Sequence, residues 1–180
     1  ANENSRSPIS RRPPGGKAAV YAEYELRALE GAGLDIGKEM ALQILMKLQQ
    51  AGLKFVLFDD ALPTLKLLKG RGLKLGVISN VGEDMASVCQ SLGLQPYLDF
   101  WVASFEVGCD KPRPGIFLAA LEKAEVEPEE AIHVGDQYES DVVGAQNVGM
   151  KAVLLDRDGS FAGTSDCPRI RSLVEVERYV

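Results

Sequence analysis

Five polar side chains stand where predicted strands end, and their types suit chemistry on a phosphate group. Ser79 and Asn80 close the apolar run LKLGVI, Lys111 comes shortly after FWVASFEV, and Asp136 and Asp141 come after AIHV. A hydroxyl and backbone N–H groups can donate hydrogen bonds to phosphate oxygens, and a lysine offsets negative charge that develops during transfer. Carboxylate oxygens suit Mg²⁺. Together these residues predict a site for a phosphorylated substrate and a magnesium ion.

Each feature also has an ordinary structural explanation when it is taken alone. A Ser-Asn pair after a strand commonly caps the next helix, and a Lys-Pro pair such as Lys111-Pro112 is typical of a solvated turn. Asp136 could cap the helix that carries Asp141. The functional interpretation therefore depends on a fold that brings these residues to one place.

A regular alternation of strands and helices after residue 58 predicts such a fold. The apolar, β-branched runs are separated by helix-length segments, as parallel strands require, and they suit a sheet covered on both faces. The fold class is α/β, with a doubly wound, Rossmann-like parallel sheet whose ligands bind at the carboxyl ends of the strands. We expect helices near 61–72, 85–92, 114–124 and 141–149, strands at 73–79, 100–107, 131–135 and 151–155, and a last helix or edge segment at 172–180.

The segment before the alternation has a different character. Residues 1–16 are polar, contain three prolines and carry three arginines, so we interpret them as a disordered leader or a severed loop. Residues 17–58 hold two helical patterns, at 18–33 and 38–52, and are expected to form a small helical cap. The α/β core then covers residues 59–180.

Composition narrows the classes of partner. The 180 residues are 46% apolar and 26% charged, which is typical of one globular domain with at most a small insert. A net charge of -6 has the wrong sign for nucleic acid or an anionic membrane, so we expect neither as a partner. Three cysteines without close pairing favour a reduced, cytoplasmic setting. Oligomeric state is left open.

Three motifs in this order and spacing resemble the haloacid dehalogenase-like hydrolase superfamily, in the subgroup with an early helical cap. VISN is similar to its second motif, KPRPGIF to its third and GDQYESD to its fourth, and the resemblance covers residues 53–158. The resemblance implies phosphate binding by Ser79, Asn80 and Lys111, charge stabilisation in catalysis by Lys111, and Mg²⁺ coordination by Asp136. For Asp141 it implies a metal-supporting role, in which the carboxylate holds either the metal or Lys111.

The nucleophilic aspartate that opens the chemistry of this family is not found in the chain. Asp59 and Asp60 follow an apolar run but lack an acid two residues later, and Asp156 and Asp158 imitate the motif only after the fourth motif. The resemblance instead places residue 1 just past the first motif, with the nucleophile upstream. The core would then lack its usual first strand, which leaves two sheet edges unpaired unless residues 53–58 fill the gap.

We therefore expect a Mg²⁺-dependent phosphatase of a small phosphorylated metabolite, truncated past its nucleophile and inactive as it stands. The alternative is a catalytically dead relative that binds a phosphorylated ligand or a protein. A dehalogenase is disfavoured, because attack on a carbon that bears a halide needs no metal to neutralise phosphate charge. His133, the single histidine, lies inside a predicted strand and is expected to be an ordinary interior or surface imidazole.

Overall fold

The computed structural model describes residues 55–80, 85–161 and 166–180, together with Gly37, Glu39, Met40, Gln43, Ile44 and Lys47. The chain divides into two compact units, Ala1–Lys54 and Phe55–Val180. In the first unit the described residues that follow Gly37 are helical, within the helical pattern expected at 38–52. The expected leader at 1–16 and the rest of the expected cap before residue 55 lie outside the described residues.

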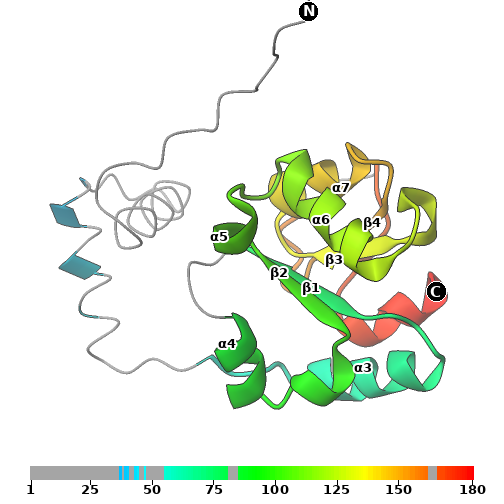
Figure 1. The fold of residues 1–180 in the computed structure, drawn as a ribbon. Helices are drawn as coiled ribbons and strands as arrows, with labels where there is room; N and C mark the ends of the chain where they lie inside the picture. The colour runs from blue at the N-terminus through cyan, green and yellow to red at the C-terminus, as the bar shows by residue number, and fades with distance from the viewer. Residues whose placement is uncertain are drawn as a thin grey trace, which may run out of the picture. The chain divides into compact units, whose positions relative to one another are not determined.

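The second unit alternates strands and helices along the chain, as Figure 1 shows. It has the α/β architecture with parallel strands that the sequence predicts. No described helix is both long and apolar enough to cross a membrane. The elements in order are α3 (Ala61–Gly70), β1 (Gly76–Ser79), α4 (Met85–Ser91), η1 (Gln95–Tyr97), β2 (Phe100–Ala103), α5 (Ser104–Val107), α6 (Pro114–Ala124), η2 (Pro128–Glu130), β3 (Ile132–Gly135), η3 (Tyr138–Val143), α7 (Gly144–Gln146), β4 (Lys151–Leu155), β5 (Arg169–Ile170) and η4 (Leu173–Arg178).

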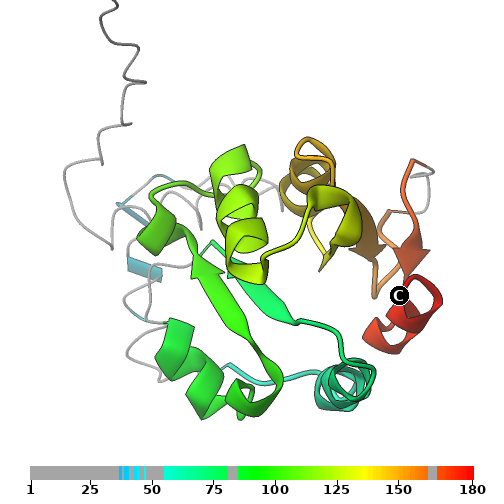
Figure 2. The ribbon, with the colours of Figure 1, turned by 45° about the vertical axis from the view of Figure 1, so that its right-hand side comes forward.

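The strands form two separate parallel sheets, whereas the sequence predicts one sheet with an unpaired gap unless residues 53–58 fill it. One sheet pairs β1 with β2, and the other has the order β3-β4-β5 (Figure 2). Within the described part of the chain, β1 therefore has no partner on its other side, and neither has β3. These two edges lack backbone pairing in the described residues, and so do the outer edges of β2 and β5.

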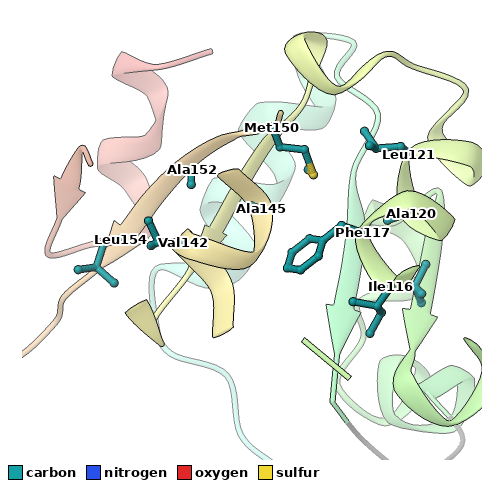
Figure 3. Close-up of a cluster of buried hydrophobic side chains, with 10 residues drawn as sticks. Ile116, Phe117, Ala120, Leu121, Val142, Ala145, Met150, Ala152 and Leu154 are labelled. Atoms are coloured by element: carbon teal, nitrogen blue, oxygen red, sulfur yellow. The ribbon is translucent and has the colours of Figure 1, made fainter. Parts of the chain in front are cut away.

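Side chains on both faces of the sheets are buried, which explains the nearly continuous apolar strands. Alternation along β4 sends Ala152 and Leu154 into one core and Val153 into another. The larger core joins residues of α6 to residues of η3, α7 and β4, and Figure 3 shows Phe117 of α6 reaching toward this second group. This core links the sheet of β1 and β2 to the sheet of β3 and β4.

The run FWVASFEV departs from its predicted form. It is a strand only to Ala103, and Ser104–Val107 form the short helix α5. The partner strand β1 ends at Ser79, opposite Ala103, so the residues beyond have no ladder to join. The chain leaves α5 through Gly108, whose φ of 79° favours glycine. The sequence reasoning also missed the two-residue strand β5, which precedes η4.

Residues 55–58, the described part of the run expected at 53–58, do not add a strand to either sheet. Phe55, Val56 and Phe58 are 63%, 84% and 65% exposed, respectively, which a central strand would not be. Leu53 and Lys54 lie outside the described residues.

Candidate functional site

The backbone of Lys111 is fixed by a side chain from the end of a neighbouring strand. Asn80, directly after β1, accepts a hydrogen bond from the Lys111 backbone N–H through Oδ1 at 2.7 Å and donates one from Nδ2 to the Lys111 carbonyl at 3.1 Å. Both polar ends of the Asn80 amide are thus used on one residue. This contact joins the segment VISN, which is similar to the second motif, to KPRPGIF, which is similar to the third.

The side chain of Lys111 is fixed from the other sheet. Its Nζ lies 2.6 Å from Oδ1 of Asp141 in η3, and the two side chains are only 14% and 3% exposed. An ammonium and a carboxylate this deeply buried need a close partner, because each loses its hydration on folding. The ion pair therefore sets where the charge of Lys111 stands.

The carboxylate of Asp141 has two further hydrogen-bond partners. His133 Nε2 lies 3.1 Å from Oδ1, and the backbone N–H of Gln137 donates to Oδ2 at 3.0 Å. Burial raises the pKa of Asp141, but the hydrogen bond of His133, the charge and hydrogen bond of Lys111 and the N–H of Gln137 outweigh it. The pKa of Asp141 therefore lies below its ordinary value.

Close packing leaves no room for this carboxylate to move toward β3. A Cβ built on Gly135 would stand 2.2 Å from Cγ of Asp141, well inside van der Waals contact. Asp141 lies in the wide helical turn Tyr138–Val143, a form that recurs at functional sites. The glycine at the end of β3 is thus required by the approach of the carboxylate.

The other predicted site residues lie at the same ends of the strands. Ser79 is the half-buried last residue of β1, and Asp136, with an exposed side chain, follows β3 directly. The structure brings Asn80, Lys111 and Asp141 into direct contact. Among the described residues, neither Ser79 nor Asp136 forms a hydrogen bond or ion pair with these three.

One of the alternative nucleophiles, Asp60, is committed to a structural role. Its carboxylate accepts two hydrogen bonds from Arg157, at 2.8 and 2.9 Å, and others from the Ser172 hydroxyl and the Leu173 N–H, each at 2.8 Å. These contacts fasten the start of α3 to the end of β4 and to η4. The neighbouring Asp59 is exposed.

Asp156, another of the alternative nucleophiles, is fully buried in the protein. Its side chain has no exposed surface, and its Oδ2 lies 3.4 Å from Nη1 of Arg169. A carboxylate that attacks a substrate must reach the reacting atom, which a fully enclosed side chain cannot do. Asp158 instead accepts a hydrogen bond from the backbone N–H of Ser160.

Sequence reasoning missed two roles at this site. It did not foresee that the Asn80 side chain binds the Lys111 backbone; the assignment of Asn80 to phosphate binding stays a prediction. It expected an ordinary interior or surface imidazole at His133, which a buried and hydrogen-bonded ring agrees with, but it did not foresee that the partner is Asp141. Strand alternation held a usable signal, because residues 133 and 135 lie on the same face of β3 and Asp141 packs against both.

The Asn80 contact leads to a first prediction. Asn80→Ala should lower the free energy of unfolding by about 1–3 kcal/mol, because it leaves the partly buried N–H and carbonyl of Lys111 without partners. Urea unfolding of the 180-residue chain measures this. Ser91→Ala is the matched control, since its exposed hydroxyl donates only to the Val88 carbonyl within the same helix. Equal losses in the two variants would contradict a special role for Asn80.

Comparison with known proteins shows which family this chain is similar to. A family model described as haloacid dehalogenase-like hydrolase matches residues 11–149. Haloacid dehalogenase-like hydrolase domain-containing protein 3 of Mus musculus is 46% identical over 97 residues, which are 54% of this chain and 39% of that protein. Glyceraldehyde 3-phosphate phosphatase of Methanopyrus kandleri is 37% identical over 101 residues, 56% of this chain and 43% of that protein. The matched region spans about two fifths of these relatives.

Solved structures extend the similarity to most of the chain. A HAD phosphatase from Thermococcus onnurineus superposes with a TM-score of 0.67 at 26% identity, covering 90% of this chain and 87% of that one. A 2-haloacid dehalogenase from Pseudomonas syringae pv. Tomato DC3000 gives a TM-score of 0.65 at 31% identity, covering 89% and 70%. Proteins of both chemistries thus share this fold.

Proposed function

We propose that this chain, which belongs to the haloacid dehalogenase-like hydrolases, is part of a Mg²⁺-dependent phosphatase of small phosphorylated metabolites. The observation that supports this most strongly is the buried ion pair of Lys111 and Asp141, anchored by Asn80 at the carboxyl ends of β1 and β3. It holds one positive charge where a parallel α/β fold binds its ligands.

The role of Lys111 follows from its tethering. A phosphoryl group in transfer spreads negative charge over its oxygens, and a fixed cation stabilises that charge without having to reorganise. Lys111 is held at its backbone by Asn80 and at its Nζ by Asp141. Ser79 is proposed to donate its hydroxyl to a phosphate oxygen. The Asn80 side chain already binds the Lys111 backbone. We therefore propose that Asn80 binds phosphate through its backbone N–H.

Asp136 is proposed as the magnesium ligand that this chain supplies. Its side chain is exposed at the end of β3, whereas both oxygens of Asp141 already accept hydrogen bonds from protein groups. The described residues contain no cluster of three or more potential ligands. One carboxylate still suits Mg²⁺, which is usually held by one or two carboxylates, water and substrate phosphate. The bound ion would neutralise phosphate charge.

The nucleophile is proposed to come from sequence upstream of residue 1. In the described part of the chain, Asp60 is bound by Arg157 and Asp156 is enclosed. Among the described residues, no strand pairs with the free side of β1 or of β3. We propose that the strand that carries the nucleophile pairs with both. On this proposal the 180-residue chain alone has no turnover.

A small phosphorylated metabolite is the proposed substrate class. The relative from Methanopyrus kandleri is named for its action on glyceraldehyde 3-phosphate. A cationic and metal-binding site at the strand ends recognises the phosphate group whatever its carrier.

In a longer protein that begins at the natural start codon, Asp136→Asn should lower the rate of Mg²⁺-dependent phosphate release at least about 100-fold, since it removes a charged metal ligand. Because the side chain is exposed, the unfolding midpoint should stay unchanged. Steady-state phosphate release across a Mg²⁺ titration tests this. Undiminished activity in the variant would remove the metal assignment.

The reaction class is tested by offering the longer protein two kinds of substrate. Release of phosphate from glyceraldehyde 3-phosphate is expected, in a Mg²⁺-dependent manner, together with no release of chloride from 2-chloropropionate. Chloride release without a need for Mg²⁺ would instead make the protein a dehalogenase.

A further inference from the structure

We propose that His133 is a positioning residue that orients the Asp141 carboxylate and, through it, the ammonium of Lys111. The inference rests on the proposed function for its catalytic consequence, but its structural part is testable without turnover. His133 and Lys111 meet on the same carboxylate oxygen, at 3.1 Å and 2.6 Å from Oδ1.

The direction of the hydrogen bond follows from the acceptor. An ionised carboxylate only accepts hydrogen bonds, and the pKa of Asp141 is held below its ordinary value. The proton between His133 and Asp141 therefore sits on Nε2 of the imidazole. His133 acts as a donor to Oδ1, while the backbone N–H of Gln137 donates to Oδ2. Each oxygen has a fixed donor that does not belong to Lys111.

Burial makes the orientation effective. The side chains of His133 and Asp141 are 10% and 3% exposed, so water has little access to replace a lost donor. In such surroundings a hydrogen bond is stronger than in water, and an unpaired polar group is costly. The carboxylate should therefore keep one orientation while His133 is present.

The imidazole is itself held in place by packing. The ring of Phe117 meets it edge to face, with centroids 5.3 Å apart and planes at 88°. Phe117 is fully buried and lies against Gly144, where a Cβ would come within 2.7 Å of the phenyl ring. The packed phenyl ring thus limits the orientations of the imidazole and helps to fix the direction of Nε2.

Substitutions can separate the donor from the packing. His133→Gln keeps an N–H donor at the position of Nε2, whereas His133→Asn carries its amide nearer to the position of Nδ1. His133→Leu removes the donor and keeps an apolar contact with Phe117. The three variants differ in hydrogen bonding to Asp141 more than in volume.

The first measurement uses the 180-residue chain itself. Lysine ammonium groups labelled with ¹⁵N are observed by NMR, and the Lys111 signal is assigned as the one that Lys111→Arg lacks. We expect this signal, slowed in exchange by the buried ion pair, in the native chain and in His133→Gln. It should broaden or disappear in His133→Leu and His133→Asn. An unchanged Lys111 signal in folded His133→Leu would overturn the proposal.

The second measurement uses the longer protein with its nucleophile. His133→Leu and His133→Asn should lower kcat about 10- to 100-fold with little change in KM, as loss of an orienting partner typically does, and His133→Gln should recover most of it. Equal kcat in all four proteins would overturn the catalytic part. If the native longer protein has no activity, the proposed phosphatase function fails, whereas the NMR result on Lys111 still decides the role of His133.

Discussion

Asp141→Ala is expected to lower the free energy of unfolding by about 3–5 kcal/mol, the usual cost of removing one partner from a buried ion pair. The Asp141 side chain is 3% exposed, and its loss leaves the ammonium of Lys111 and the Nε2 of His133 without their acceptor. Against a total stability of about 5–15 kcal/mol, this is a large fraction. Urea unfolding of the 180-residue chain measures it.

Lys123→Ala is the matched control for this effect. The Lys123 side chain is 48% exposed, lies 4.0 Å from Glu106 and donates a hydrogen bond to the Trp101 carbonyl at 2.8 Å, so its contacts together are worth about 0–2 kcal/mol. A loss for Asp141→Ala no larger than that of the control would contradict the proposed importance of the buried pair. Lys111→Ala should also lower the free energy of unfolding by more than the control, because it removes the ion-pair partner of the buried Asp141 carboxylate.

Asp60→Ala is expected to cost roughly 2–3 kcal/mol, the range for hydrogen bonds to a charged group. The Asp60 carboxylate joins α3 to Arg157 after β4 and to the first residues of η4, with a side chain only 14% exposed. The guanidinium of Arg157 also stacks over the ring of Phe58 at 4.1 Å, which the substitution would loosen. The neighbouring Asp59→Ala, at an exposed position, should change stability by less than about 0.5 kcal/mol.

The Asp60 carboxylate should make the free energy of unfolding depend on pH. The hydrogen bond of Arg157 lowers the pKa of Asp60 below its ordinary value, more than burial raises it. A carboxylate whose pKa is lower in the folded state than in the unfolded state stabilises the fold at pH values above its unfolded-state pKa, which is about 3.9 for Asp. This stabilisation is lost as the pH falls from that value toward the folded-state pKa. The difference in unfolding free energy between native protein and Asp60→Ala should therefore shrink as the pH falls below about 4. A difference that stays constant would contradict the ion pair.

The parts of the fold that the sequence predicts best are those with strong periodicity. The patterns at 61–72, 114–124 and 151–155 correspond to α3, α6 and β4, because local apolar spacing and the burial it produces agree there. The run FWVASFEV is less predictable, since its apolar residues continue past Ala103 where the neighbouring strand ends. Which residues of a run stay in a strand depends on the length of its partner, which periodicity does not contain.

The candidate site is predictable in its residue types but not in its contacts. The motif order gathers Asn80, Lys111 and Asp141, and the structure joins them directly. The use of the Asn80 amide on the Lys111 backbone depends on how the loop after α5 folds back to β1. The contact of His133 with Asp141 depends on the turn at 138–143, which carries the carboxylate back over Gly135.

The central proposal is that the catalytic aspartate lies on a strand outside these 180 residues; it would fit the edges of β1 and β3, which have no partner strand among the described residues. The measurement that tests it most directly is hydrolysis of p-nitrophenyl phosphate with Mg²⁺. It compares this chain with a longer protein that begins at the natural start codon. The account predicts turnover only in the longer protein. Turnover in the 180-residue chain would mean that one of its own carboxylates is the nucleophile, and would contradict the claim.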